Sequence, residues 1–201
     1  MGNLNIKTIE KTIKTQKAYD LFPPLPSRSK FGIIYADPPW DYKGQLQHAG
    51  KDSGDSGGAL RHYPTVKTKD LMALPIQTIT AEDCLLFMWA TSPHLDQAID
   101  LGKAWGFDWA TVAFVWHKSK PNPGFYTMSE NELCLVFKMG KIPNPRGARN
   151  IRQTINEPRS IHSRKPEAVR KGIEDMFPDQ KKIELFARKK TKGWRCWGNE
   201  L

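Results

Sequence analysis

The sequence predicts a doubly wound α/β fold, in which helices cover both faces of a mostly parallel β-sheet. Three observations lead to this prediction. Apolar runs such as Phe31–Ala36 and Cys84–Ala90 are continuous rather than alternating, which is typical of strands buried on both faces. Segments with apolar residues at helical spacing separate these runs. The chain has 201 residues, which fits one domain with a substantial core.

The first predicted strand follows an N-terminal arm, residues 1–30. The arm places isoleucines at helical spacing between residues 4 and 19, and a proline-rich stretch excludes regular structure before Phe31. The strand ends at Asp37, because Pro38 and Pro39 remove two backbone donors. Ligands bind at the carboxyl ends of strands in open α/β sheets, so we expect Asp37 to Trp40 to lie at the functional site.

The remaining elements follow in order. A glycine-rich segment, residues 44–60, is expected to be a flexible loop, acting as a substrate lid or simply disordered. A basic loop is expected at residues 142–160. The predicted helices are a short one at 69–74, one opening at Thr91 and one opening at Lys165, and the further predicted strands are 84–90, 110–116, 132–137 and 182–187. We expect all of these to form a single domain, residues 1–201.

The residue types from Asp37 to Trp40 suit methylation of an exocyclic amino group. Such a nitrogen is a poor nucleophile while its lone pair is conjugated with the ring. The Asp37 carboxylate and the Pro38 carbonyl could accept its hydrogens and weaken that conjugation, and Trp40 could stack on the base. The alternative for this tetrapeptide, taken alone, is an ordinary turn after a strand.

Composition favours a polyanionic partner. The formal net charge is +10, and residues 138–171 contain ten Lys or Arg but only two acids. This stretch is either solvated surface or a loop that contacts phosphates, with Arg146, Arg149 and Arg152 as the candidate contacts.

The cysteines and the apolar segments indicate the cellular environment. Cys84, Cys134 and Cys196 are far apart, so we expect neither a disulfide framework nor a metal site. No secretory segment and no apolar stretch of spanning length is recognised, so we expect a soluble protein of the reducing cytoplasm without a membrane anchor.

Several aromatic residues have alternative interpretations. Trp89, Trp105 and Trp116 are expected in the core, since aromatic residues on buried strands usually pack. Trp194 and Trp197 could either pack or line a pocket. His162 has no partner histidine at metal-ligand spacing, so we expect a hydrogen-bonding role in a loop.

Eight short motifs together resemble, in the right order, the MT-A70 type family of adenine N6-methyltransferases. The match extends from about Asp20 to Leu201. The motifs are Asp37-Pro-Pro-Trp40, His62-Tyr-Pro-Thr65, Trp89-Ala-Thr91, Val115-Trp-His-Lys118, Ser129-x-x-Glu132, His162-Ser-x-Lys165-Pro166, Glu184-Leu-Phe-Ala-Arg188, and Gly193-Trp194 with Gly198-Asn-Glu200.

The resemblance implies a Rossmann-like fold that uses S-adenosylmethionine and carries its catalytic motif before its main cofactor-binding motif. It assigns the catalytic motif to Asp37, Pro38, Pro39 and Trp40. It implies cofactor contacts from residues at both ends of the chain, namely Asp20, Leu21, Asp37, Arg188, Lys190, Asn199 and Glu200.

Two positions depart from the eukaryotic enzyme of this family. Glu200 stands where that enzyme has glutamine, and Asn131 replaces a cofactor-binding lysine. The resemblance also suggests substrate contacts by His62, Tyr63 and Lys118. His62 and Tyr63 could instead belong to an ordinary loop, and Lys118 could face a phosphate or only solvent.

The sequence therefore predicts an adenine N6-methyltransferase acting on nucleic acid, by direct displacement and without a covalent enzyme intermediate. DNA is the preferred substrate, because the chain is compact and resembles the bacterial and phage branch. RNA methylation is the alternative, followed by a non-catalytic nucleic-acid-binding partner subunit. A homodimer would suit so small a chain, and no metal is expected.

Overall fold

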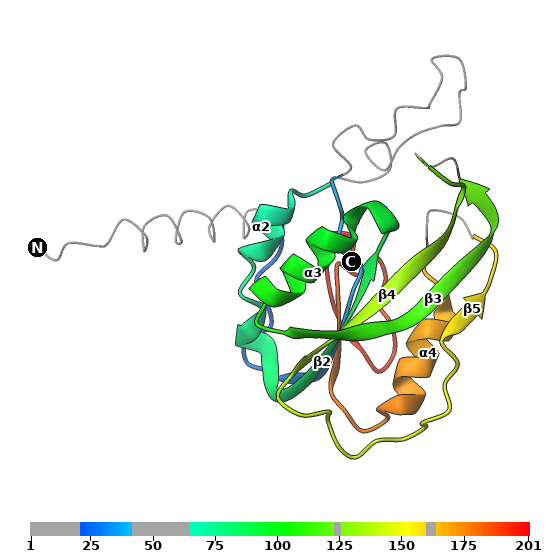
Figure 1. Cartoon of the computed structure of the whole chain (residues 1–201). Coiled ribbons are helices and arrows are strands. Elements are labelled where there is room, and N and C mark those ends of the chain that lie inside the picture. Colours follow the sequence, from blue (N-terminus) through cyan, green and yellow to red (C-terminus); the bar gives the residue numbers. More distant parts are fainter. Residues whose placement is uncertain (1–20, 42–64, 123–125, 160–163) are drawn as a thin grey trace, which may run out of the picture.

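The fold is built on one seven-stranded β-sheet (Figure 1). The computed structural model describes residues 21–41, 65–122, 126–159 and 164–201. The strand order is β5-β3-β4-β2-β1-β6-β7. The strands are β1 (Phe31–Ala36), β2 (Thr80–Ala90), β3 (Asp108–Asn122), β4 (Ser129–Met139), β5 (Thr154–Asn156), β6 (Lys182–Leu185) and β7 (Arg195–Trp197).

Strand β1 lies inside the sheet, as its continuous apolar sequence predicts. Its six residues are all buried. It pairs in parallel with β2 on one side and β6 on the other, with Ile34 opposite Leu86 and Ile183. Strand β4 is antiparallel to both β2 and β3, and the other recorded pairings are parallel. The carboxyl ends of β1, β2 and β6 therefore meet at one edge of the sheet.

Helices cover both faces of the sheet, which confirms the doubly wound fold. Helices α2 (Thr68–Met72) and α3 (Leu95–Ala104) lie on one side and α4 (Glu167–Met176) on the other (Figure 1). Two 3-10 helices, η2 (Ile76–Ile79) and η3 (Ser92–His94), precede β2 and α3. Within β1, Ile34 belongs to the core beneath α2 and α3, and Ile33 belongs to the core beneath α4. Alternate residues of this strand thus fill two cores.

The predicted elements differ from the observed ones mainly at the margins of the sheet. Strand β3 extends well beyond the predicted 110–116, to Asn122. The loop predicted at 142–160 contains β5, and the tail contains β7. As predicted, residues 22–30 form neither helix nor strand. Residues 1–20 and the whole of the predicted loop at 44–60 lie outside the described residues. No helix of the described chain is long and apolar enough to cross a membrane.

Candidate active site

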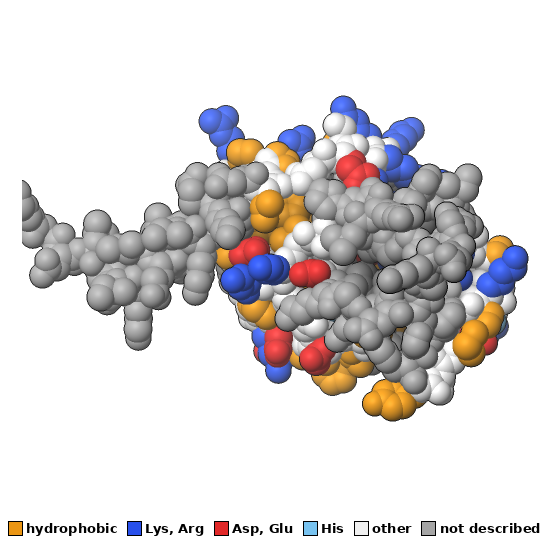
Figure 2. Space-filling view, turned by 90° about the horizontal axis from the view of Figure 1, so that it is seen from above, with side chains coloured by type: hydrophobic (Ala, Val, Ile, Leu, Met, Phe, Trp, Pro, Cys, Tyr) orange, Lys and Arg blue, Asp and Glu red, His pale blue; other side chains and the backbone are white. Residues whose placement is uncertain are grey.

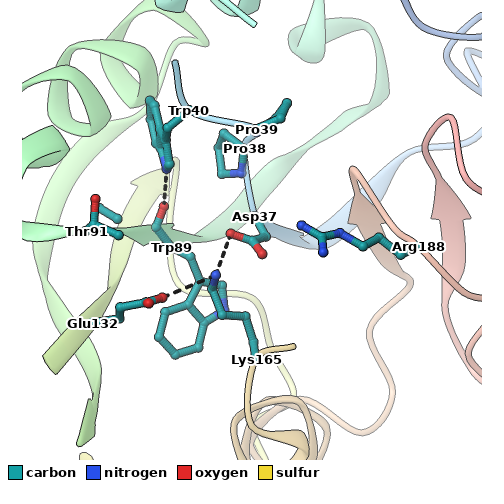
Figure 3. Close-up of a pocket in the computed structure, with 10 residues that line it drawn as sticks. Asp37, Pro38, Pro39, Trp40, Trp89, Thr91, Glu132, Lys165 and Arg188 are labelled. Atoms are coloured by element: carbon teal, nitrogen blue, oxygen red, sulfur yellow. Dashed lines mark hydrogen bonds and ion pairs between the residues drawn. The ribbon is translucent and has the colours of Figure 1, made fainter. Parts of the chain in front are cut away.

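A polar pocket opens at the carboxyl edge of the sheet, where β1, β2 and β6 end (Figure 3). It encloses about 440 Å³, including space open to solvent at its mouth. Ten residues line it: Asp37, Pro38, Pro39, Trp40, Trp89, Ala90, Thr91, Glu132, Lys165 and Arg188.

Lys165 joins two carboxylates at the floor of this pocket. Its Nζ lies 3.0 Å from Asp37 Oδ1 and 3.2 Å from Glu132 Oε2 (Figure 3). The ammonium also lies 5.6 Å from the centre of the Trp89 ring. Glu132 in turn contacts Lys118, whose Nζ is 3.3 Å from Oε1. The charges therefore alternate in the order Asp37, Lys165, Glu132 and Lys118. Glu132 contacts each lysine through a different carboxylate oxygen.

The pairing determines how these groups ionise. Burial by itself would raise the pKa of Glu132, but the charges of Lys165 and Lys118 outweigh burial and lower the pKa of this carboxyl. Burial by itself would lower the pKa of Lys165, yet Asp37 and Glu132 hold this pKa well above its ordinary value. Glu132 and Lys165 are therefore both charged at neutral pH.

The Asp37-Pro-Pro-Trp40 motif is fixed by hydrogen bonds along its backbone. The Trp40 backbone N–H donates to the Pro38 carbonyl at 2.9 Å, and Val66 N–H donates to the Pro39 carbonyl at 2.8 Å. A carbonyl oxygen has two lone pairs, so Pro38 keeps one acceptor site. This is a more restricted acceptor than the sequence suggested.

The side chain of Trp40 is also held in place by its neighbours. Its Nε1 donates to the Trp89 carbonyl at 3.2 Å, and its ring stacks on His94 with centroids 5.6 Å apart. Burial lowers the pKa of His94, so the stacked imidazole is neutral at physiological pH. Trp40 is only 4% exposed, although it lines the pocket. Stacking of Trp40 on a target base stays a prediction.

The proposed cofactor half comes from β6 and the tail. Arg188 follows β6 and lines the same pocket as Asp37. Asn199 Nδ2 donates to the Leu21 carbonyl at 2.5 Å, which brings these two predicted residues together. Lys190 and Glu200 are exposed. The Arg188 guanidinium donates hydrogen bonds, the Asn199 carboxamide donates and accepts, and the Asp37 and Glu200 carboxylates accept. Such a set fits a ligand with an amino-acid group and a ribose, as in S-adenosylmethionine.

The backbone around Arg188 is tightly constrained. Phe186 has φ 60°, a left-handed conformation that is uncommon for residues other than glycine. A Cβ added to Gly198 would lie 2.4 Å from the Ala187 carbonyl oxygen. The Ala187 N–H donates to the Trp197 carbonyl at 2.9 Å, which ties the end of β6 to the tail. Glycine at 198 therefore allows the tail to approach β6.

Several predicted substrate residues do not meet at the pocket. Arg146 lies beside the end of α4, with its guanidinium 5.5 Å from the centre of the Phe177 ring. The neighbouring Gly147 and Ala148 bond to carbonyls of the last residues of α4, which end at the opposite edge of the sheet. Arg149 and Arg152 are exposed on this same loop, before β5.

Other predicted positions have clear placements. Lys118 is 4% exposed and pairs with Glu132, so it faces neither solvent nor an open phosphate site. Trp194 and Trp197 pack: Trp194 lies against Tyr35, and Trp197 against Phe22 and Phe186. Trp89, Trp105 and Trp116 are core residues, as predicted. Asp20, His62, Tyr63 and His162 lie outside the described residues.

Sequence reasoning did not assign Lys165 and Glu132 to the site. Both occur in the quoted motifs, and a lysine directly before Pro166 at the start of a helix was a usable signal. The contacts of Lys165 with Asp37 and with Glu132 are long-range, however: they join the segment before α4 to the residue that follows β1 and to β4. Among the described residues, no group of three or more His, Cys, Asp or Glu side chains is arranged to hold a metal ion.

The chain is similar in sequence to known proteins over most of its length. The MT-A70 family model matches residues 31–200. The chain is 49% identical to the type II methyltransferase M.MunI of Mycoplasma over 205 residues, covering 97% of this chain and 88% of that protein.

Eukaryotic relatives are more distant. The chain is 27% identical to the N(6)-adenosine-methyltransferase MT-A70-like protein of Drosophila melanogaster, covering 86% of this chain and 27% of that protein. It is 25% identical to the human N(6)-adenine-specific methyltransferase METTL4, covering 89% of this chain and 39% of that protein. The chain therefore spans less than half of these longer relatives.

The sheet order, the helices on both faces and the pocket at the carboxyl edge define a Rossmann-like methyltransferase. Strand β6 lies beside β1, so the pocket combines Asp37 with Arg188, two residues far apart in sequence. The chain belongs to the MT-A70 family. The predicted family and fold are confirmed.

Proposed function

We propose that this protein transfers a methyl group from S-adenosylmethionine to the exocyclic N6 amino group of adenine in DNA. The observation that carries the proposal is the position of the Asp37 carboxylate in the pocket, where Lys165 contacts one of its oxygens and Arg188 lines the same space. The 49% identity to a type II methyltransferase supports it.

The chain's own residues act on the target amino group. Lys165 contacts Asp37 Oδ1, which leaves Oδ2 to accept one amino hydrogen. The remaining lone pair of the Pro38 carbonyl accepts the other. Two acceptors draw the nitrogen out of conjugation and direct its lone pair toward the methyl donor. The base reaches them unstacked, since an amino group inside a duplex is inaccessible.

The cofactor would be held at the β6 side of the pocket. Arg188 would bind the carboxylate of its amino-acid group, and Asn199 and Glu200 its ribose hydroxyls, with Leu21 adjacent through its contact to Asn199. Asp20 and Lys190 complete the proposed set. When bound, the cofactor would supply an electrophilic methyl group; the amino nitrogen would attack that carbon, a thioether would leave as the S–CH3 bond breaks, and the nitrogen would give its extra proton to solvent.

The cysteines are consistent with direct transfer. Cys84 is buried, and burial raises its pKa to about 12. Cys134 is also buried, and its pKa is raised well above its ordinary value, chiefly by burial. Both remain neutral thiols at physiological pH and are poor nucleophiles. Transfer therefore proceeds without an enzyme–base intermediate at either cysteine.

DNA is the proposed substrate on charge and relationship. The formal net charge of +10 suits a polyanion, and Lys and Arg side chains gather along one margin in the view onto the carboxyl edge (Figure 2). RNA is the second candidate, because several relatives are named N(6)-adenosine-methyltransferases. We place the protein in the cytoplasm of a bacterial or phage-infected cell, acting alone or as a homodimer.

The experiment supplies methyl-labelled S-adenosylmethionine with equal amounts of duplex DNA, single-stranded DNA and RNA, and then identifies the labelled nucleoside. We expect N6-methyladenine, with the most label in DNA. Label in cytosine, or none in any nucleic acid, would contradict the proposal. Label found only in the adenine of RNA would show that the substrate is RNA rather than DNA, and the proposed N6 methylation would still hold.

A further inference from the structure

Lys118 is a buried lysine that reaches the active-site charges without lining the pocket. It is 4% exposed, and its Nζ lies 3.3 Å from Glu132 Oε1. The pocket instead contains Glu132 and Lys165. A buried ammonium is costly unless it is paired, so its place beside Glu132 requires an explanation.

The backbone of β3 is distorted directly after Lys118. Ser119 has φ 62°, and the pairing of β3 with β4 shifts register between His117 and Asn122. Irregularities of this kind re-aim side chains and occur next to functional sites. Trp116 lies opposite Glu132 in the ladder, so Lys118, two residues on, is a diagonal neighbour of Glu132.

The contacts divide the Glu132 carboxylate between two cations. Oε1 contacts Lys118, and Oε2 contacts Lys165. Lys165 then contacts Asp37 Oδ1 at 3.0 Å. Two ammonium groups and two carboxylates balance in formal charge. Without Lys118, Oε1 would lose its cation, and Glu132 could turn both oxygens toward Lys165 and draw it away from Asp37.

We propose that Lys118 is a positioning residue for methyl transfer: through Glu132 it holds Lys165 against Asp37. The proposal rests on the catalytic role proposed for Asp37. Lys118 contacts neither the base nor the cofactor. It fixes the orientation of the carboxylate that anchors Lys165, and so determines which Asp37 oxygen faces the target amino group.

The test compares Lys118→Met with Lys118→Arg, which keeps the charge. A shift of about 1 Å at a reacting group can cost up to about 100-fold in rate, so we expect Lys118→Met to lower kcat on DNA by at least about tenfold. KM for S-adenosylmethionine should stay within about twofold, because the altered contacts lie outside the cofactor half. Lys118→Arg should retain most of the activity.

The pH dependence gives a second readout. Lys118 and Lys165 both lower the pKa of Glu132 against its burial, and the carboxylate is faced by Lys118 from β3 and Lys165 from the segment before α4, with Asp37 on the far side of Lys165. Removing one cation raises that pKa. The acid limb of the kcat profile should therefore move to higher pH in Lys118→Met than in the wild-type protein.

The matched control is Lys182→Met. Lys182 is a second buried lysine, 7% exposed, but its ammonium donates to the carbonyls of Pro178 and Gln180, remote from the pocket. Lys182→Met should lower the melting temperature without moving the acid limb of the kcat profile. If Lys118→Met does not fold, Lys118→Gln takes its place with the same expectations.

A crystal structure of the Lys118 variant gives a readout that needs no activity. We expect the distance from Lys165 Nζ to Asp37 Oδ1 to increase beyond about 4 Å, the limit of an ion pair. An unchanged distance, or a variant that resembles Lys182→Met in rate and pH profile, would overturn the proposal. Failure of the wild-type protein to methylate any nucleic acid would instead count against the proposed function.

Discussion

At the scale of single residues, the site depends on one lysine shared by two acids. Lys165 lies within ion-pair distance of Asp37 and Glu132, and its side chain is only 15% exposed. Two carboxylates this close to one cation would repel each other in its absence. Lys165 therefore allows both acids to stay charged at the floor of a partly desolvated pocket.

Replacing Lys165 by Met should be strongly destabilising. Removing one partner of a buried ion pair typically costs about 3 kcal/mol, since the remaining charges are left uncompensated. Urea unfolding at pH 7 would measure the loss. The control is Lys171→Met, which removes a pair with Asp175 on the solvent-exposed side of α4 and should cause no measurable change. Equal losses in the two variants would contradict the assigned role of Lys165.

Some residues of the site could be predicted from the sequence and others could not. Asp37 was predictable because a buried strand ends there in two prolines, and its position needs only the strand direction. Lys165 contacts Asp37, and Glu132 contacts Lys165, through tertiary packing; the motifs contain both residues but do not reveal these contacts. The burial of Lys118 was missed because the turn at Ser119, with φ 62°, is adopted by a residue that gives no hint of it.

At the scale of elements, the cofactor half depends on how the tail meets β6. Phe186, in a left-handed conformation, turns the chain at the end of β6, and its ring packs against Phe22 and Trp197. Gly198 then lies against the Ala187 backbone. These contacts set the separation between Arg188 and Asn199.

Gly198→Ala should therefore weaken cofactor binding. The added Cβ would lie 2.4 Å from a backbone oxygen, which cannot move as a flexible side chain can, so the tail must shift. We expect the Kd for S-adenosylmethionine to rise by about tenfold, corresponding to about 1.4 kcal/mol. Calorimetric titration would measure it. The control is Gly193→Ala, where no atom lies within 4 Å of the added Cβ but φ is +83°, so stability should fall with little effect on affinity.

Elements with strong apolar patterns were predictable and marginal strands were not. Strands β1, β2, β4 and β6 were each predicted, and in β1 and the second half of β2 continuous burial leaves a continuous apolar sequence. Strands β5 and β7 have three residues each, and β5 has no fully buried one. Their pairing with β3 and β6 is imposed by the rest of the sheet rather than by their own sequences.

At the scale of the whole molecule, the ion pairs predict the response of stability to pH. The pKa of Glu132 is lowered by Lys165 and Lys118 against its burial. The pKa of Glu167 is lowered to about 2; burial alone would raise it, and hydrogen bonds from Arg170 and Arg164 outweigh burial. A carboxyl with a lowered pKa stabilises the fold above its unfolded pKa and loses that contribution as pH falls through its folded pKa.

We therefore expect stability to decline as pH falls from about 4.5 toward about 2, since unfolded glutamate titrates near 4.3. The raised pKa of Lys165 keeps its contribution until the pH rises through that higher value. Thermal melts across the acid range would measure the decline that the carboxyl groups cause. Glu132→Gln should flatten the acid decline, and an acid decline of unchanged slope would contradict the predicted ionisation of Glu132.

The overall design joins the two ends of the described chain at one edge of the sheet. The strand that ends in Asp37 lies beside the strand that leads to Arg188, and the pocket needs both. Binding of the methyl donor and activation of the target nitrogen are therefore assigned to different segments, and a substitution at one should spare the other.

The most direct test measures both functions in Asp37→Ala: single-turnover methyl transfer to adenine in DNA, and the Kd for S-adenosylmethionine. Asp100→Ala, an exposed substitution on α3, is the control. We predict that Asp37→Ala reduces transfer by at least about 100-fold, as loss of a polarising group does elsewhere, while the Kd stays within about threefold of wild type. Transfer at the wild-type rate, or loss of transfer explained entirely by loss of cofactor binding, would contradict the role assigned to Asp37.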